Sequence, residues 1–298
     1  MKIGSSGRKN HRPIEVRRFP AYNVHRVRLC NVYPEYFARA VSSELMRAVE
    51  WDVIPSAPQS AHMHMALDEV LLERVAAGLR RPTLRLWEWI EPALVIGSHQ
   101  SVLNEVDVVA ARELGFVVTR RMSGGGTMLC EPGRTITYSL YLPESVVAGI
   151  SFRKSYAVLD DWAVQAFIEL GIPASYREIN DIISPRGKIA GAAQARRRGF
   201  VLHHTTIAHT MEVDLLPRLI RVGRPAIAQT GVRSADKSVS PLSWFTDLSC
   251  PDVARNLAEY FSKEFRVHPS TITPEELRDA DHLVAAKYAT QAWINRLP

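Results

Sequence analysis

Three consecutive glycines follow a pair of arginines in RRMSGGGTMLCEPG, residues 120–133. Because glycine has no Cβ, such a run lets backbone N–H groups approach an anion closely. A Walker A loop would need GxxxxGK[ST], and a Rossmann loop would need glycine at the sixth position, where Leu129 stands. The stretch therefore predicts either a different loop that binds a carboxylate or phosphate, or a glycine-rich hairpin turn without a ligand.

Arg120 and Arg121 end the strand-like run FVVTRR directly before these glycines. Successive side chains of a strand point to opposite faces. We therefore expect only one of the two guanidinium groups to face the ligand. The other is expected to face solvent or to form a salt bridge.

A lysine opens a second run with chemical potential, GKIAGAAQARR. Strand alternation places Lys188 on one face together with Ala190, Ala192, Gln194 and Arg196. Small side chains around a long cation leave room for a ligand, and an ammonium group suits the charge that develops on a phosphate or carbonyl oxygen. The alternative is a solvated lysine in a hairpin.

Asn180 and Asp181 precede this strand at the start of another one. Such a pair often only turns the chain, but it could also hold a magnesium ion or a ribose. His203, His204 and His209 follow without HExxH spacing and without a nearby thiol. We therefore expect half-buried strand residues at these histidines and no metal site.

Hydrophobic periodicity and turn residues indicate the elements that must position these groups. Strands paired by short turns and mixed with a few helices indicate an α+β fold and not a doubly wound parallel sheet. The expected helices are at about 61–77, 106–114, 151–170, 252–265 and 274–290, and the expected strands are at 83–89, 93–99, 116–121, 135–143, 180–184, 187–197 and 201–214.

The 298-residue chain has 46% hydrophobic and 23% charged residues, which is typical of a soluble globular protein. It contains no apolar run of 18 residues, so we expect no membrane span. The net charge of +6 comes from the first thirty residues, which hold eight Lys or Arg and one acid. The remainder has 29 basic and 30 acidic residues, so we expect no nucleic-acid partner.

The basic start of the chain lacks the apolar segment of a secretory signal. It is interpreted as a flexible extension or an over-early start, with an organelle transit peptide as the alternative. Three widely spaced cysteines without a CxxC motif favour a reducing compartment. The expected location is the cytoplasm, or an organelle matrix if the start is a transit peptide.

Three motifs in order, RRMSGGGTM, NDIISPRGKIAGAAQARRRGFVLHHTT and SADKSVSPLS, resemble those of the lipoate-protein ligase A family, with its biotin/lipoate protein ligase catalytic domain. The resemblance covers roughly residues 51–298. It implies a mixed, largely antiparallel sheet flanked by helices, as in class II synthetases and biotin ligases. It also implies that ATP and Mg serve to activate lipoate or octanoate to an acyl-adenylate.

The acceptor that the resemblance implies is a lysine of a lipoyl carrier domain, in 2-oxoacid dehydrogenase E2 subunits or the glycine cleavage H protein. It divides the chain into a basic extension (1–45), a catalytic domain (46–265) and a C-terminal helical tail (266–298). The final KYATQAWINRLP is similar to the junction with the ligases' small accessory domain. Adenylation could therefore need a separate accessory subunit.

Lys188 is similar to the lysine that, in this family, touches both the adenylate and the acyl carbonyl. Asp181 is the implied magnesium ligand. Burying the acyl chain in an alanine-lined slot could contribute about 0.8 kcal/mol per CH₂. The implied substrate- and nucleotide-binding residues are Arg121, Ser123, Gly124, Gly125, Gly126, Thr127, Met128, Leu129, Asn180, Asp181, Gly191 and Ala192.

Two departures from the family pattern keep other activities open. Cys130 stands where many members have histidine after the glycines, and ASYREIND offers only Ser175 where the thiol-dependent transferases have their nucleophile. One alternative is an octanoyl or lipoyl transferase that moves the acyl group between carriers or from supplied acyl-AMP, with Cys130 as nucleophile. Another is a non-catalytic protein that binds lipoate or a carrier.

Overall fold

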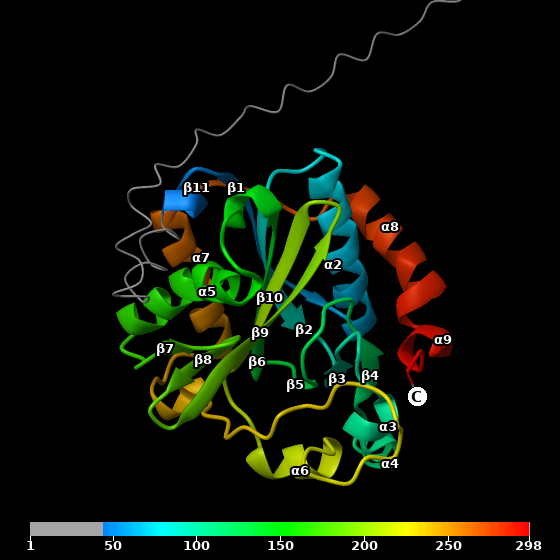
Figure 1. The fold of residues 1–298 in the computed structure, drawn as a ribbon. Coiled ribbons are helices and arrows are strands. Elements are labelled where there is room, and N and C mark those ends of the chain that lie inside the picture. The colour runs from blue at the N-terminus through cyan, green and yellow to red at the C-terminus, as the bar shows by residue number, and fades with distance from the viewer. Residues whose placement is uncertain (1–43, 298) are drawn as a thin grey trace, which may run out of the picture. The chain divides into compact units, whose positions relative to one another are not determined.

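The structure, a computed structural model, describes residues 44–297. An eight-stranded sheet forms its centre, in the order β11-β1-β2-β6-β10-β9-β8-β7 (Figure 1). Only the β1–β11 and β1–β2 pairs are parallel, so the sheet is mixed and largely antiparallel as predicted. The strands are β1 (Glu50–Gln59), β2 (Thr83–Trp89), β6 (Thr135–Pro143), β7 (Ser175–Arg177), β8 (Asp181–Ser184), β9 (Gly187–Arg197), β10 (Phe200–Ala208) and β11 (Arg266–Pro269).

A second, three-stranded sheet holds the glycines. Its order is β4 (Val117–Arg120), β3 (Ala93–Ile96) and β5 (Met128–Cys130). The segment 121–127, which we call the glycine loop, connects β4 to β5 across β3. Two strands of one small sheet therefore fix both ends of the loop.

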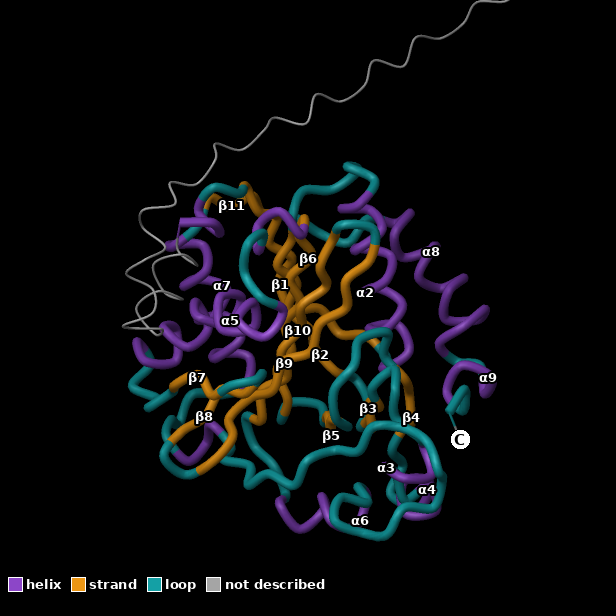
Figure 2. Tube along the Cα trace, viewed as in Figure 1, coloured by secondary structure: helices purple, strands orange, loops and turns teal. Residues whose placement is uncertain are grey.

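Helices cover the large sheet on both faces (Figures 1 and 2). On one face α2 (Ala61–Ala76) contacts β6 and β10 and carries α8 (Pro274–Leu283) on its outer side. On the other, α5 (Phe152–Glu169) packs with α7 (Cys250–Glu264) over the largest apolar core. We refer to these as the α2 face and the α5 face.

Serine and threonine side chains cap the N-termini of these helices. The hydroxyls of Ser60, Ser151 and Ser249 each accept the N–H group three residues onward. Thr273 forms a reciprocal capping box with Glu276 at the start of α8. These bonds satisfy backbone N–H groups that have no partner within the helix.

Several predicted boundaries were wrong. The helix expected at 106–114 is α4 (Val108–Glu113), which Asp107 caps, but a further helix that was not predicted, α3 (Val102–Glu105), precedes it. The strand expected at 201–214 ends at Ala208 and is followed by α6 (Leu216–Leu219). The helix expected at 274–290 gives way to a π-helical turn, Val284–Tyr288, before α9 (Gln291–Ile294).

Strands β1, β5, β7 and β11 were not predicted; β5 and β7 have only three residues each. The prediction of a flexible extension or transit peptide falls almost entirely on residues 1–43, outside the described residues. Within residues 44–297, no helix has both the length and the apolar composition needed to cross a membrane.

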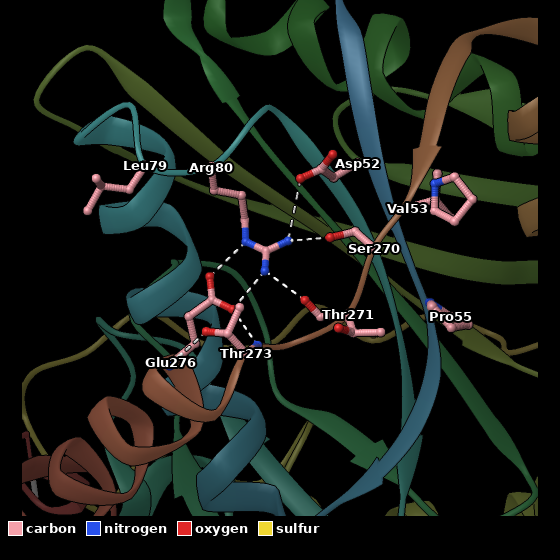
Figure 3. Close-up of a pocket in the computed structure, with 10 residues that line it drawn as sticks. Asp52, Val53, Pro55, Leu79, Arg80, Ser270, Thr271, Thr273 and Glu276 are labelled. Carbon is pink, nitrogen blue, oxygen red and sulfur yellow. Dashed lines mark hydrogen bonds and ion pairs between the residues drawn. The ribbon is translucent and has the colours of Figure 1, made fainter.

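A depression of about 640 Å³ lies where α8 meets β1, and it holds a buried ion pair (Figure 3). Arg80 contacts both carboxylate oxygens of Glu276 at 2.7 Å and also donates to Ser270 Oγ and the Thr271 carbonyl. Both charged side chains are about 5% exposed. None of the predicted site residues lines this depression, so we interpret it as the clamp that holds α8.

Arg80→Ala is expected to lower the free energy of unfolding by about 2 kcal/mol, because charge-assisted bonds to a poorly hydrated carboxylate are lost. Burial raises the pKa of Glu276, but Arg80 and the hydrogen bonds from Thr273 together outweigh burial, so the net pKa is below its ordinary value of 4.5. The contribution should therefore be present above pH 4.5 and disappear as the pH falls through the lowered value. Urea unfolding measures both effects. The neighbouring Arg81, 53% exposed, is the control; an equal loss in Arg81→Ala would contradict the clamp.

Candidate active site

The side chain of Arg121 lies inside the glycine loop and binds its carbonyl groups. Its guanidinium donates to the carbonyl oxygens of Gly124 at 2.6 Å and Gly126 at 2.7 Å, and to Val95 at 2.9 Å. Its Nε also donates to Ser123 Oγ at 3.1 Å. Burial lowers the pKa of Arg121 to about 10, which leaves it charged at neutral pH. The charge therefore serves to hold the loop carbonyls inward.

The amide groups of the three glycines are correspondingly available. Among the described residues, no protein acceptor contacts the N–H of Gly124, Gly125 or Gly126, whereas the next amide, of Thr127, donates to Ser234 Oγ at 2.8 Å. Gly125 has a φ of +87°, which favours glycine. Consecutive unpaired amides next to a buried guanidinium form a suitable site for an anionic oxygen.

Arg120 lies on the opposite side of β4, as strand alternation predicted, but it faces neither solvent nor a carboxylate. It is fully buried and donates to carbonyl groups of Gly97 and Gln100 on one side and Ile294 on the other. The expectation of a solvent contact or salt bridge was wrong. This arginine instead joins the C-terminal segment to the turn beneath the glycine loop.

The predicted face of the lysine strand was also wrong. The register of β8 and β9 shifts between Ile182 and Ile183, and Ile189 and Ala190 both lie in the core under the α5 face. This β-bulge reverses the alternation, so Lys188 shares the α2 face with Gly191. Ala190, Ala192 and Gln194 lie on the other face, so they cannot form the alanine-lined slot.

The bare backbone of Gly191 makes room for the end of the Lys188 side chain. A Cβ on Gly191 would lie 2.3 Å from Lys188 Nζ and 2.7 Å from its Cε. Ala193, the next residue on this face, is within van der Waals distance of a Cβ built on Gly125 of the glycine loop. The ammonium group and the glycine loop therefore meet the same face of β9, at positions two residues apart along the strand.

Gly191→Ala is expected to displace the lysine end and lower kcat/KM for the acyl transfer that the family resemblance implies by about 10- to 100-fold, because a misplaced group loses its catalytic geometry. The far end of a lysine moves easily, so the unfolding midpoint should stay near that of wild type. Steady-state kinetics and thermal unfolding check these outcomes. In the Lys188→Ala background, Gly191→Ala should not lower kcat/KM any further. If the two losses added in full, Gly191 would act independently of Lys188.

Asp181 holds two ammonium groups at this point. Its Oδ1 lies 2.8 Å from Lys188 Nζ and its Oδ2 lies 2.5 Å from Lys237 Nζ. Burial raises the pKa of Asp181, but the two lysines outweigh it, and the net pKa is below the ordinary value. Burial lowers the pKa of Lys188, Asp181 raises it, and the positive charges of Lys237 and Arg121 lower it further, so its net pKa is also below the ordinary value. The cluster carries one net positive charge when all three groups are ionised.

Lys237 was not predicted as a site residue, although its segment was noted as a motif. It belongs to residues 229–240, which we call the strap. Ser234 of the strap bonds the buried carboxylate of Glu105 through its amide and its hydroxyl, and a Cβ on Gly126 would lie 3.0 Å from its Oγ. Further on, Ser238 accepts the Lys188 amide at 2.8 Å. The strap therefore crosses from the glycine loop to the lysine strand.

The remaining predicted residues have other contacts. Asn180 donates its side-chain amide to the Ala192 carbonyl at 2.6 Å and accepts the Ala192 amide at 2.8 Å, so it links β8 to β9. The side chain of Ala192 points to the α5 face. Met128 and Leu129 pair with β3, and Leu129 is buried in an apolar cluster away from the loop.

A magnesium ion does not fit the residues present. Each oxygen of Asp181 already faces an ammonium group, which would repel a divalent cation. No cluster of three or more histidine, cysteine or acidic side chains within residues 44–297 could hold a metal ion. We therefore assign no role to Asp181 as a metal ligand.

The histidines and cysteines also differ from expectation. His203, His204 and His209 are buried, not half-buried, and each has a polar partner. Cys130 lies fully buried in β5, and burial raises the pKa of its thiol. A nucleophilic thiolate requires the opposite environment, so Cys130 is not the nucleophile of a transferase. Ser175 is exposed on the edge strand β7.

The fold is that of the lipoate-protein ligases. A bipartite lipoate protein ligase from Thermoplasma acidophilum superposes with a TM-score of 0.70 at 24% identity, over 84% of this chain and 98% of that one. A lipoate-protein ligase A bound with ATP gives 0.68 at 24% identity, over 84% and 100%. At this identity the likeness establishes the architecture, which confirms the predicted fold class.

The sequence comparisons define the family. The model of the lipoyl protein ligase A/B catalytic domain matches residues 60–262, so the chain belongs to this family and is one of its ligase or transferase enzymes. The octanoyltransferase LipM of Brevibacillus brevis is 30% identical over 276 residues, covering 82% of this chain and 98% of the relative. The LipM of Geobacillus kaustophilus is 29% identical over 273 residues, with 82% and 97% coverage.

Proposed function

We propose that the protein transfers an octanoyl or lipoyl group from an activated donor to a lysine of a lipoyl carrier domain. The observation that carries the proposal is that the ammonium group of Lys188 lies over Gly191, on the same face of β9 as Ala193, which neighbours Gly125 in the loop with the free amides. It is supported by likeness to octanoyltransferases along nearly their whole length.

In the transfer step, the carrier's amine forms a C–N bond to the acyl carbon, and the bond from that carbon to the leaving group breaks. The amine loses a proton, and the leaving group receives one. Negative charge develops on the carbonyl oxygen as the amine attacks. Lys188 and the glycine amides are suited to stabilise that charge, because they are fixed donors that need little reorganisation.

The proposed donor is an octanoyl group bound to a carrier as a thioester, because the two sequence relatives compared above are named octanoyltransferases. ATP is not needed for that reaction. The octanoyl group would pass to lipoyl domains such as those of E2 subunits or the H protein. This replaces ATP-dependent ligation as the leading hypothesis.

A second candidate is the ligase reaction, in which ATP and free lipoate or octanoate form an acyl-adenylate. Two ammonium groups on Asp181, together with the unpaired amides of the glycine loop, suit the phosphate of an adenylate. In addition, the two cysteines among the described residues, Cys130 and Cys250, are both buried. A thiol-bound acyl intermediate at either would need a large opening of the fold.

Intact-mass analysis of an apo lipoyl domain separates these reactions. One incubation supplies octanoyl carrier protein without ATP, and the other supplies octanoate or lipoate with ATP and magnesium. A gain of one octanoyl mass in the first supports carrier-to-carrier transfer. A gain only in the second supports the ligase. With no gain in either, including with supplied acyl-AMP, acyl transfer is the wrong function.

A further inference from the structure

A buried hydrogen-bonded chain runs from the glycine loop to α2. Ser123 Oγ lies 2.6 Å from Nε2 of His204, and His204 Nδ1 lies 2.8 Å from Oδ2 of Asp68. All three side chains are at most 2% exposed. Ser139 and Tyr141 donate to the other oxygen of Asp68. The large sheet thus fixes Asp68, and Asp68 orients the ring that contacts the loop.

The partners determine where the protons lie. An ionised carboxylate only accepts, so Nδ1 of His204 carries the hydrogen that points to Asp68. Nε2 is then unprotonated and accepts the hydroxyl hydrogen of Ser123. Arg121 Nε–H donates to the same hydroxyl oxygen at 3.1 Å. Ser123 is therefore held from two sides, by an acceptor on β10 and a donor at the end of β4.

This arrangement bears directly on the three free amides. Ser123 immediately precedes Gly124, and its own carbonyl accepts the Ser98 amide at 2.8 Å. Its side chain and main chain are thus both fixed where the loop begins. The glycines themselves do little to restrict rotation of their own peptide groups, because they have no side chains to pack. The direction of their N–H groups depends on the residues that hold the loop at its start and on the carbonyl contacts of Arg121.

We propose that His204, oriented by Asp68, is a positioning residue that acts through Ser123 to keep the glycine amides directed at the acyl donor. The proposal rests on the proposed function, since the amides act on the donor only in that reaction. His204 does not touch the donor. It sets the loop geometry, and a misdirected amide stabilises the developing oxyanion less.

The arrangement requires neutral His204. Burial lowers its pKa below 6.5; Asp68 opposes this, while the charges of Arg121 and His203 favour it. Another charged group near this carboxylate is Arg85 of β2, 3.6 Å from Asp68 Oδ1. The neutral ring is therefore the form present at neutral pH, and protonation occurs only as the pH falls through a value below 6.5.

A protonated ring would direct a second N–H at Ser123 Oγ, where Arg121 Nε–H already lies. The hydroxyl hydrogen would lose its acceptor, and two cationic donors would share one oxygen. We therefore expect the transfer rate to decline on the acidic side, below pH 6.5, in step with opening of the loop.

The neighbouring His203 supplies a matched control. It is fully buried, and its Nε2 lies 2.6 Å from Oδ1 of the buried Asp160, but it faces α5 and not the glycine loop. His204→Asn can keep the bond to Asp68 while removing the acceptor for Ser123. His203→Asn makes the same change of residue one position away. Any general loss of stability should appear in both variants.

We expect His204→Asn to lower kcat/KM by on the order of 10²-fold, and His203→Asn to leave it within about threefold of wild type. His204→Gln places an amide oxygen near the Nε2 position, where it can accept from Ser123 without titrating. The His204→Gln variant should therefore recover much of the wild-type activity, and its transfer rate should no longer decline at acidic pH. Similar losses in the two asparagine variants, or an unchanged acidic decline in His204→Gln, would refute the positioning role.

The coupling to Ser123 is tested with a double-mutant cycle. Ser123→Ala and His204→Asn together should cost little more than Ser123→Ala alone; independent, additive losses would overturn the proposal. Hydrogen exchange of the peptide that spans residues 120–130 gives a readout that does not depend on enzymatic activity. It should be faster in His204→Asn than in His203→Asn, and equal rates would count against the inference. A wild-type protein without transfer activity but with this exchange difference would reject only the proposed reaction.

Discussion

Lys188→Ala is expected to lower kcat/KM for acyl transfer by about 10²- to 10³-fold, the usual cost of removing one fixed donor from a developing oxyanion. The ammonium group is directed over Gly191 by Asp181, 2.8 Å away, and its side chain is still 27% exposed. It is therefore both oriented and accessible. Steady-state transfer of octanoyl groups to an apo lipoyl domain, followed by mass spectrometry, measures the loss.

The loss should reflect chemistry and not unfolding, because Asp181 keeps its second partner, Lys237, at 2.5 Å. The unfolding midpoint of Lys188→Ala should therefore remain close to that of wild type. Lys263→Ala is the control, since Lys263 is 66% exposed and pairs with Glu169 on the surface. Full activity in Lys188→Ala would remove this lysine from the mechanism.

Much of the site could be predicted from local patterns. Three glycines between two strands indicate a loop with exposed amides, and a lysine among small residues indicates a cation beside a ligand. Both inferences depend on short stretches whose geometry is determined by neighbouring residues. The same reasoning predicted β2, β6 and β9 with the observed boundaries.

The rest depends on contacts between distant segments. The bulge at Ile189 leaves no signature in GKIAGAAQARR, because its cause is the register with β8. Arg121 was expected to face the ligand, whereas its guanidinium is occupied by the carbonyls of its own loop. Lys237 reaches Asp181 only because the strap is anchored on Glu105. Local periodicity contains none of this information.

The parallel roles of the two adjacent histidines could not be read from sequence either. His203 and His204 point to opposite faces of β10, and each meets a buried aspartate from a different helix, Asp160 of α5 or Asp68 of α2. Only the packing of a helix on each face creates these pairs. In the sequence, two histidines in a strand suggest only half-buried polar residues.

Arg120→Met should lower the free energy of unfolding by about 4 kcal/mol, because it removes the donor from several buried carbonyl groups at once. The Arg120 guanidinium contacts carbonyls of Gly97 and Gln100 at 2.9 and 2.7 Å and of Ile294 at 2.7 Å. Methionine keeps the apolar stem but can satisfy none of these acceptors. Urea unfolding gives the change directly.

The same substitution should also lower the affinity of the glycine loop for the acyl donor. Gly97 packs against the carbonyl of Gly125, where a Cβ on Gly97 would lie only 2.2 Å from that oxygen, so movement of the turn at 97–100 shifts the glycine loop. Arg112→Met, at an exposed position on α4, is the control and should change stability by less than about 0.5 kcal/mol. If Arg120→Met lowered stability while donor affinity stayed at the wild-type value, the C-terminal segment and the glycine loop would be independent. A joint loss would mean that this buried cation couples the C-terminal segment to the loop that we propose binds the acyl donor.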